Sequence, residues 1–123
     1  MEIIISNSSN QPIYEQIVSQ IKAGIMQGAL KGGEQLPSIR ALANDLHVSV
    51  ITTKRAYADL EEQGFVQTVQ GKGSFVTDGN AELLKEERLK VIEGHLQKAL
   101  DEAAVADVPT EELHVMLDAL AEG

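Results

Sequence analysis

The hydrophobic residues follow two kinds of spacing along the chain, and each kind predicts a different type of element. Isoleucine recurs at every fourth position from Ile13 to Ile25, with Pro12 before this segment and Gly28 after it. This spacing predicts a helix with a single apolar stripe, begun by a proline and ended by a glycine. Residues 2–5, of sequence EIII, are rich in β-branched side chains and predict a short strand ahead of that helix.

Two further apolar stripes lie close together and predict a helix-turn-helix unit. The second predicted helix opens at Ser38, and the third opens at Ser49 and ends at Gly64. A serine hydroxyl accepts a hydrogen bond from the unpaired amides of a helix start, and glycine readily ends a helix. Because only His47 and Val48 connect the two helices, the turn between them is tight.

Residues that favour β-structure follow the third helix and predict a hairpin. Residues 65–70 and 74–77 supply its two strands, and Gly71, Lys72 and Gly73 form its tip. Three helices and a hairpin make a winged helix-turn-helix. The predicted fold class is therefore mainly α with a small β-hairpin.

The remaining residues predict a tail of two helices. A long helix with apolar residues three and four positions apart is followed, after Pro109, by a second helix from about Thr110. Two amphipathic helices cannot bury their stripes alone, so the tail must meet either the first domain or a second copy of the chain. We therefore predict a winged-helix head over residues 1–79 and a dimerisation tail, a helical hairpin, over residues 80–123. The residues expected in the dimer seam are Leu89, Ile92, Leu96, Leu113, Leu117 and Leu120.

The formal net charge of the chain is −9, but the acidity is concentrated in the tail. Residues 80–123 hold 11 Asp and Glu against 4 Lys and Arg, whereas residues 1–79 hold 8 against 6. Mobile ions screen exposed charges beyond about 8 Å at physiological ionic strength. A basic face on the head is therefore compatible with an acidic tail, and the net charge does not exclude binding to nucleic acid.

The third predicted helix is the candidate reading element, because the second helix of a helix-turn-helix unit enters the major groove of DNA. The residues expected to face inward are Thr53, Ala56, Tyr57 and Leu60. The residues left toward solvent or DNA are Val50, Ile51, Thr52, Lys54 and Arg55.

The start of this helix carries residues with two interpretations each. Val50 either packs against neighbouring elements or contacts thymine methyl groups, which apolar side chains read in the major groove. For Ile51 we favour packing. Ser49 either caps the amide of Thr52, the interpretation we favour, or donates to a phosphate.

The basic residues of this region are also open to two interpretations. Lys54 and Arg55, taken alone, are explained by surface pairing with Asp59 or Glu61. Arg40 changes this balance, because it lies in the first turn of the second predicted helix, where the helix dipole disfavours a cation. An anionic partner would compensate for that placement.

The glycines at the hairpin tip serve either a tight turn or a close approach of the backbone to a ligand. In the second interpretation the wing lies along the minor groove, with Lys72 on a phosphate or a base edge. The complete set of candidate DNA-binding residues is Arg40, Ser49, Val50, Thr52, Lys54, Arg55, Gly71 and Lys72.

The sequence offers no catalytic or metal-binding pattern. Cysteine is absent, and His47, His95 and His114 do not cluster in the sequence. We therefore expect no enzyme activity, no metal and no cofactor. No apolar run approaches the ~20 residues that a membrane helix requires, and the N-terminus does not look like an export signal. A cytoplasmic protein without a membrane partner is expected.

Four sequence motifs between Pro12 and Val76 belong together. They are PIYEQI, LPSIRALA around the second predicted helix, VS followed by KRAY in the third, and QGKGSFV at the wing. In these motifs the chain resembles the winged-helix head of the GntR family of bacterial transcription regulators. The tail resembles that of the YtrA-type subfamily, whose short tails mediate dimerisation in place of a large ligand domain.

The resemblance implies a set of contacts to operator DNA, made by Arg40, Ser49, Thr52, Lys54, Gly71 and Lys72. Many family members carry arginine directly after the serine that starts the third helix, where this chain has Val50. The core bases of the operator can differ accordingly. Members of the subfamily often repress their own operon together with genes for ABC transporters.

Two functions of different classes follow from these observations. The leading hypothesis is a homodimeric, sequence-specific DNA-binding regulator, a repressor that occupies a pseudo-palindromic operator. The alternative is a winged-helix module that binds proteins through its acidic tail and does not bind DNA. The sequence identifies neither a small-molecule effector nor the operator and regulated genes.

Overall fold

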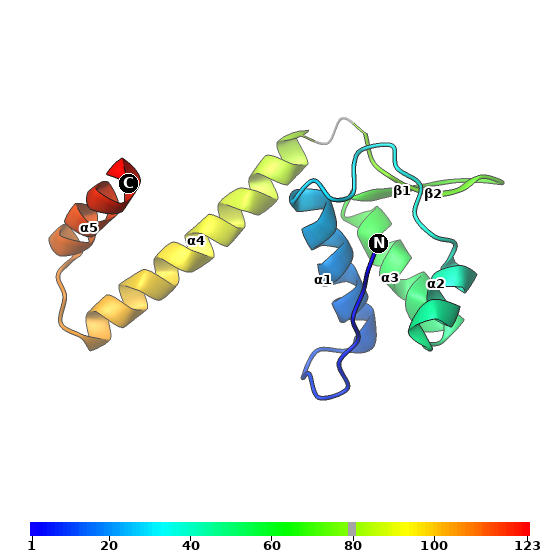
Figure 1. The fold of residues 1–123 in the computed structure, drawn as a ribbon, viewed down its shortest axis with the longest axis horizontal. Coiled ribbons are helices and arrows are strands. Elements are labelled where there is room, and N and C mark those ends of the chain that lie inside the picture. The colour runs from blue at the N-terminus through cyan, green and yellow to red at the C-terminus, as the bar shows by residue number, and fades with distance from the viewer. Residues whose placement is uncertain (79–80) are drawn as a thin grey trace. The chain divides into compact units, whose positions relative to one another are not determined.

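The fold was analysed in a computed structural model that describes residues 1–78 and 81–123 (Figure 1). Its elements are α1 (Ile13–Met26), α2 (Ile39–Leu46), α3 (Val50–Glu62), β1 (Val66–Val69), β2 (Gly73–Val76), α4 (Ala81–Val105) and α5 (Thr110–Glu122). The predicted fold class, mainly α with a β-hairpin, is confirmed.

The chain divides into two compact units, Met1–Leu84 and Lys85–Gly123. The boundary predicted from the sequence, between residues 79 and 80, lies outside the described residues. The first unit includes the first turn of α4, because Leu83 and Leu84 pack against the core formed by the three preceding helices and the hairpin. No helix in the described ranges is long and apolar enough to cross a membrane.

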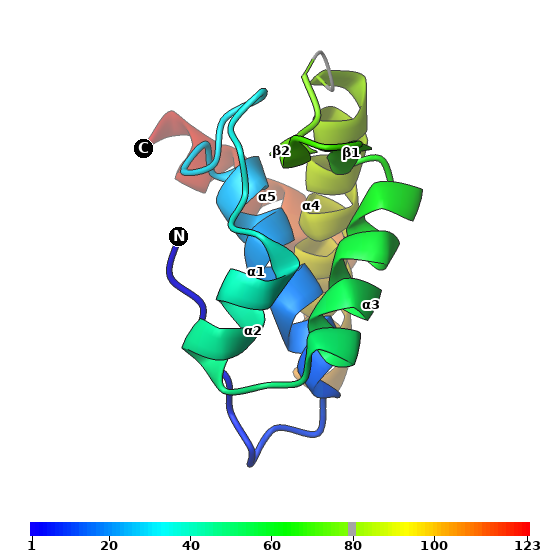
Figure 2. The ribbon, with the colours of Figure 1, turned by 90° about the vertical axis from the view of Figure 1, so that its right-hand side faces the viewer.

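The core of the first unit lies between α1, α3 and the hairpin (Figure 2). The isoleucine stripe of α1 is buried as its spacing predicts, with Ile17 and Ile21 fully inaccessible. Leu60 of α3 and Phe65, which begins the hairpin, are also fully buried. Burial of a large apolar side chain contributes roughly 1.5–3 kcal/mol, so this cluster provides most of the stability of the unit.

The turn between α2 and α3 is fixed by backbone conformation and by one buried hydroxyl. His47 adopts a left-handed conformation (φ 56°) at the end of α2, and the Val48 amide donates to the Ala43 carbonyl at 3.0 Å. The Tyr57 hydroxyl of α3 donates to the Pro37 carbonyl just before α2, at 2.7 Å. Burial raises the pKa of Tyr57 to about 12, so this hydroxyl stays protonated and keeps the two helices in register.

The hairpin is antiparallel, and a third segment is joined to its outer edge. β1 and β2 pair from Val66 with Val76 to Val69 with Gly73. The Leu36 amide donates to the Ser74 carbonyl, and the Val76 amide donates to the Glu34 carbonyl, each at 2.8 Å. The loop before α2 therefore holds β2 from the side opposite β1.

The short strand predicted over residues 2–5 is wrong. This segment lies along α1, where the Ile4 amide and carbonyl bond the side-chain amide of Gln20 at 2.9 and 2.7 Å. Two residues on, the Ser6 amide and carbonyl bond the side chain of Gln16 in the same way, at 2.8 and 3.0 Å. A glutamine amide carries the same donor and acceptor as a peptide group, so two side chains replace a partner strand.

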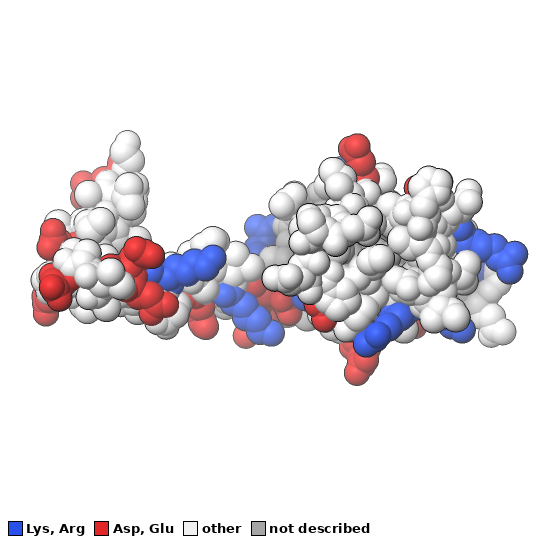
Figure 3. Space-filling model, turned by 90° about the horizontal axis from the view of Figure 1, so that it is seen from below, with Lys and Arg blue, Asp and Glu red and all other residues white. Residues whose placement is uncertain are grey.

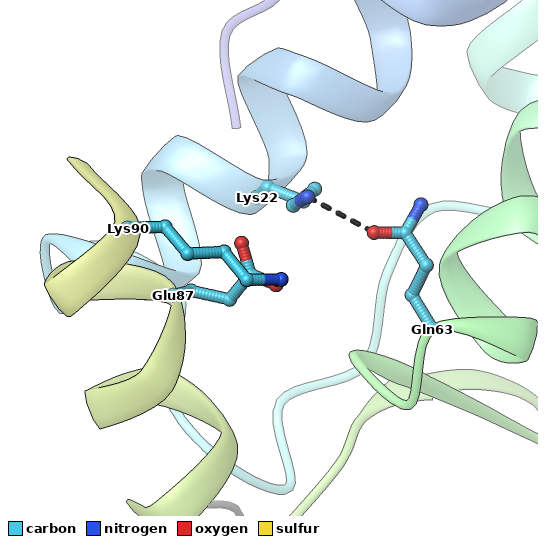
Figure 4. Close-up of polar contacts among 4 residues, drawn as sticks. All are labelled: Lys22, Gln63, Glu87 and Lys90. Atoms are coloured by element: carbon cyan, nitrogen blue, oxygen red, sulfur yellow. Dashed lines mark hydrogen bonds and ion pairs between the residues drawn. The ribbon is translucent and has the colours of Figure 1, made fainter. Parts of the chain in front are cut away.

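The second unit contains α5 and most of α4, joined by a turn in which Asp107 has a φ of 57°. Ala103 is buried in this unit, and the Val108 amide donates to its carbonyl at 2.8 Å. Lys90 and Glu87 form an ion pair of 3.5 Å on the surface of α4 (Figure 4). An ion pair three residues apart on one helix contributes roughly 0.2–0.5 kcal/mol, so it does not define the fold.

Candidate nucleic-acid interface

The rotation of α3 about its axis is set by its buried face. Thr53, Ala56, Tyr57 and Leu60 are all buried, as their spacing predicts. Successive residues of a helix are about 100° apart, so Ile51, two residues before Thr53, lies about 160° from it. The outer face of α3 therefore begins with Ile51 and continues through Arg55.

The start of α3 is capped by Ser49, which confirms the favoured interpretation. The Ser49 hydroxyl accepts from the Thr52 amide at 3.0 Å and donates to the Thr52 hydroxyl oxygen at 2.8 Å. With both of these bonds made, the Ser49 hydroxyl has no hydrogen left for a phosphate. The Thr52 hydroxyl accepts in this pair and keeps its own hydrogen to donate, so Thr52 is the outward-facing donor of this turn.

The packing predicted for Ile51 is wrong, because its side chain is 81% exposed. Its position opposite the core leaves no element of the first unit to cover it. Val50, one residue earlier, is 47% exposed, so its side chain is divided between packing and solvent.

The predicted basic residues occupy exposed positions. Arg40 lies in the first turn of α2, and Lys54 faces outward from α3. The guanidinium of Arg55 lies over the ring of Tyr14 in α1, at 3.8 Å from the ring centroid. Within the described residues neither Lys54 nor Arg55 forms the surface ion pairs with acidic residues that were considered from the sequence.

The first turns of the helices differ in charge. The first turns of α1, α4 and α5 each hold an acidic residue, whereas those of α2 and α3 hold none. An acidic side chain there stabilises a helix by about 0.3–1 kcal/mol. The acidic residues of α3 lie in its C-terminal part instead, at Asp59, Glu61 and Glu62. The helices α2 and α3 thus lack this stabilisation. In return, no acidic side chain of the first turn lies beside the exposed backbone amides at their starts.

Figure 3 shows charged side chains of both signs on one face of the two units. Red acidic side chains are most numerous over the α4–α5 unit, where blue ones lie beside them, and blue Lys and Arg side chains project from the winged-helix unit, which also carries red ones.

Lys22, on α1, is turned toward the end of α3 and not toward its start. Its Nζ donates to the Gln63 side-chain oxygen at 2.9 Å (Figure 4), and it lies 5.1 Å from the centroid of the Phe65 ring. The Gln63 side-chain nitrogen donates in turn to Asp59 at 3.0 Å. Lys22 therefore stabilises the packing of α1 on α3.

The wing tip depends on a residue that sequence reasoning missed. The side-chain nitrogen of Gln35 donates to the Lys72 carbonyl at 2.9 Å, while the Lys72 side chain is exposed. Gly73 has a φ of 122°, and a Cβ there would lie 2.9 Å from the same Gln35 nitrogen. The backbone conformation therefore favours glycine, and a Cβ would also require the end of the Gln35 side chain to shift. No sequence pattern links Gln35 with Lys72, because they are 37 residues apart.

These features define a winged helix-turn-helix that presents a capped helix start, four exposed basic residues (Arg40, Lys54, Arg55 and Lys72) and a wing held by a hydrogen bond from Gln35. Comparison with known proteins gives the family. Residues 13–76 match the model of "Bacterial regulatory proteins, gntR family". The chain is 35% identical over 112 residues to the HTH-type transcriptional repressor YtrA of Bacillus subtilis (strain 168), covering 91% of this chain and 86% of that protein.

Solved structures agree with the sequence matches. A transcriptional regulator from Oenococcus oeni superposes with a TM-score of 0.82 at 26% identity, over 95% of this chain and 97% of that one. AraR(DBD), solved in complex with operator ORX1, superposes with a TM-score of 0.56 at 30% identity, over 63% of this chain and 96% of that one. The chain belongs to the GntR family, and to its YtrA-type subfamily. It is a DNA-binding transcription regulator and not an enzyme.

The role of Ser49 as a cap can be tested by stability. Ser49→Ala is expected to lower the free energy of unfolding by about 1 kcal/mol, because the Thr52 amide loses its acceptor. Ser49→Asn, whose side chain also caps, should stay close to the wild type. Urea denaturation followed by circular dichroism measures both, and an Ala variant as stable as the wild type would contradict the role.

The role of Gln35 at the wing can be tested by backbone dynamics. Gln35→Ala is expected to lower the NMR order parameters of residues 71–73, because the tip loses the hydrogen bond that the Gln35 side chain donates to Lys72. The loss of stability should stay within about 0.5–1.5 kcal/mol, the net contribution of one hydrogen bond. Gln67→Ala, exposed on the same hairpin, serves as the control, and unchanged order parameters in Gln35→Ala would show that the bond is not needed.

Proposed function

We propose that the chain is a homodimeric repressor that binds a pseudo-palindromic operator through α3 and the wing of each head. The observation that carries this proposal is the absence of acidic residues from the first turns of α2 and α3, together with exposed Arg40, Lys54 and Lys72. A helix start with free amides and no nearby carboxylate favours a phosphate ligand.

Each part of the head has a separate task in this proposal. α3 enters the major groove, where Val50, Thr52 and Lys54 meet base edges or phosphates and Arg55 contacts the backbone. α2 crosses the backbone and brings Arg40 to a phosphate or a base. The wing, with Gly71 at its turn, brings Lys72 to the minor groove. Ser49 contributes by holding Thr52 and the helix amides in place.

Repression is supported by similarity. YtrA of Bacillus subtilis, similar along most of its length, bears the name of a transcriptional repressor. A repressor of this design acts by occupying its site and excluding polymerase. Its own operon, with genes for an ABC transporter, is the target suggested by the subfamily resemblance.

Dimerisation through the tail is supported by exposed apolar residues. One stripe of α4 carries Leu89, Ile92 and Leu96, each 43–53% exposed, and α5 carries Leu117 and Leu120, which are also exposed. Leu113 is partly covered within its own unit. A second copy of the tail offers the same stripe, and two-fold pairing would place two heads on two half-sites.

DNA binding can be tested with the fragment upstream of the gene. A shift assay with random competitor DNA should retain a complex, and log affinity should fall with log salt with a slope of about −4 to −5 if the dimer neutralises roughly four to six phosphates. Arg40→Ala is expected to weaken binding by about 1–3 kcal/mol if Arg40 contacts a base. Lys98→Ala is the control: it removes the same positive charge, but from the tail, and this variant should bind DNA like the wild type. Retention of full affinity by Arg40→Ala would refute its assignment.

The residues that form the dimer interface can be tested by measuring the mass of the protein in solution by sedimentation. The wild type is expected to sediment at twice its chain mass of 13.3 kDa, and Leu96→Glu should yield monomers because it places a charge in the seam. Val91→Glu, about 140° around α4 and similarly exposed, is the matched control and should remain dimeric. If the Leu96→Glu variant remains dimeric, Leu96 does not lie in the dimer interface.

A further inference from the structure

Large hydrophobic side chains are exposed at few places in residues 1–78. They are Met1 and Ile4 in the N-terminal segment, and Val50 and Ile51, the first two residues of α3. Ile51 is the most exposed of the four, at 81%. Two adjacent apolar residues therefore stand at the start of the helix that carries the proposed interface.

Neither packing nor helix stability explains Ile51. Its side chain lies opposite the buried face, so it adds nothing to the core. β-Branched residues are poorer helix formers than most, and an acidic residue in this first turn would be stabilising. An isoleucine here is therefore unfavourable for the isolated protein, and its benefit must come from a bound partner.

The surroundings of Ile51 favour DNA as that partner. The same helix face holds Lys54 and the outward hydroxyl of Thr52, and acidic residues do not occur until Asp59. A protein or second copy seated on Ile51 would also meet the charge of Lys54. In the proposed complex the first turn of α3 points at base edges, so Ile51 is continuous with that interface.

Among the major-groove edges of the four bases, only thymine carries an apolar group, its C5 methyl. We infer that Ile51, with Val50 beside it, contacts thymine methyl groups in each half-site and so makes the regulator selective for thymine at those positions. This inference rests on the proposed function, because it requires α3 to lie in the major groove.

The experiment replaces thymine by deoxyuridine in the footprinted upstream fragment, which removes only the methyl group. The wild type is expected to bind the fully substituted fragment more weakly, by about fourfold for each methyl group that Ile51 buries. Ile51→Ala should reduce this difference, and the double variant Val50→Ala, Ile51→Ala should bind the two fragments equally. Single substitutions along each half-site then identify the thymines concerned.

Ile4→Ala is the matched control, because Ile4 is also an isoleucine on the surface of the head, 74% exposed. It should retain the preference for thymine over deoxyuridine. The inference is overturned if the wild type binds both fragments equally, or if Ile51→Ala keeps the full preference. It is also overturned if Ile51→Ala changes the sedimenting mass, since a second copy would then cover this side chain.

Failure of the proposed function gives a different result. If the wild type forms no complex with either fragment, DNA binding itself is refuted, and the thymine contact with it. If the wild type binds both fragments with the same affinity, the regulator still binds DNA but does not read the methyl group.

Discussion

The packing of one face of α3 against the core is the constraint on which the interface depends. Four residues of that face, at successive spacings of three, one and three positions, are buried. A helix held along one stripe cannot rotate without exposing those side chains, at a cost of a few kcal/mol. The buried face thereby decides which residues face outward. The Tyr57 hydroxyl of α3 donates a hydrogen bond to the Pro37 carbonyl just before α2. This bond fixes the position of α2 relative to α3.

The exposed starts of α2 and α3 in the helix-turn-helix unit are less stable than these helices could be. Its two helices lack acidic residues in their first turns, and α3 places its acidic residues near its C-terminus, against the helix dipole. Serine caps compensate in part, since each satisfies one amide and adds no charge. A carboxylate cap would satisfy the same amide but repel phosphate. Serine at both positions therefore stabilises the helix starts and does not repel an anionic ligand.

The sequence predicted those features that local spacing determines. The helices, the hairpin, the Ser49 cap and the inward face of α3 follow from periodicity and from the residues at the helix ends. The errors arose where a distant partner decides the outcome. Residues 2–5 have strand-forming side chains, but Gln20 of α1 bonds the Ile4 backbone, and Gln16 bonds the backbone of Ser6 just beyond this segment. No local pattern indicates the role of Gln35, because its partner is far along the chain. The hydrophobicity of Ile51 predicts packing, but its position opposite the buried face of α3 leaves it exposed.

The separation of charge between the two units makes DNA binding compatible with an acidic chain. Nonspecific attraction to DNA grows with the number of phosphates that basic residues neutralise. A head with few exposed cations and a net acidic chain has a weak attraction of this kind, so affinity must depend more on contacts at the base edges. The apolar start of α3 fits this requirement, because contact with a methyl group contributes at a matching base and adds nothing on the phosphate backbone. In the proposed complex, the acidic residues in the tail and the apolar residues at the start of α3 would therefore act in the same direction, toward selectivity over general affinity.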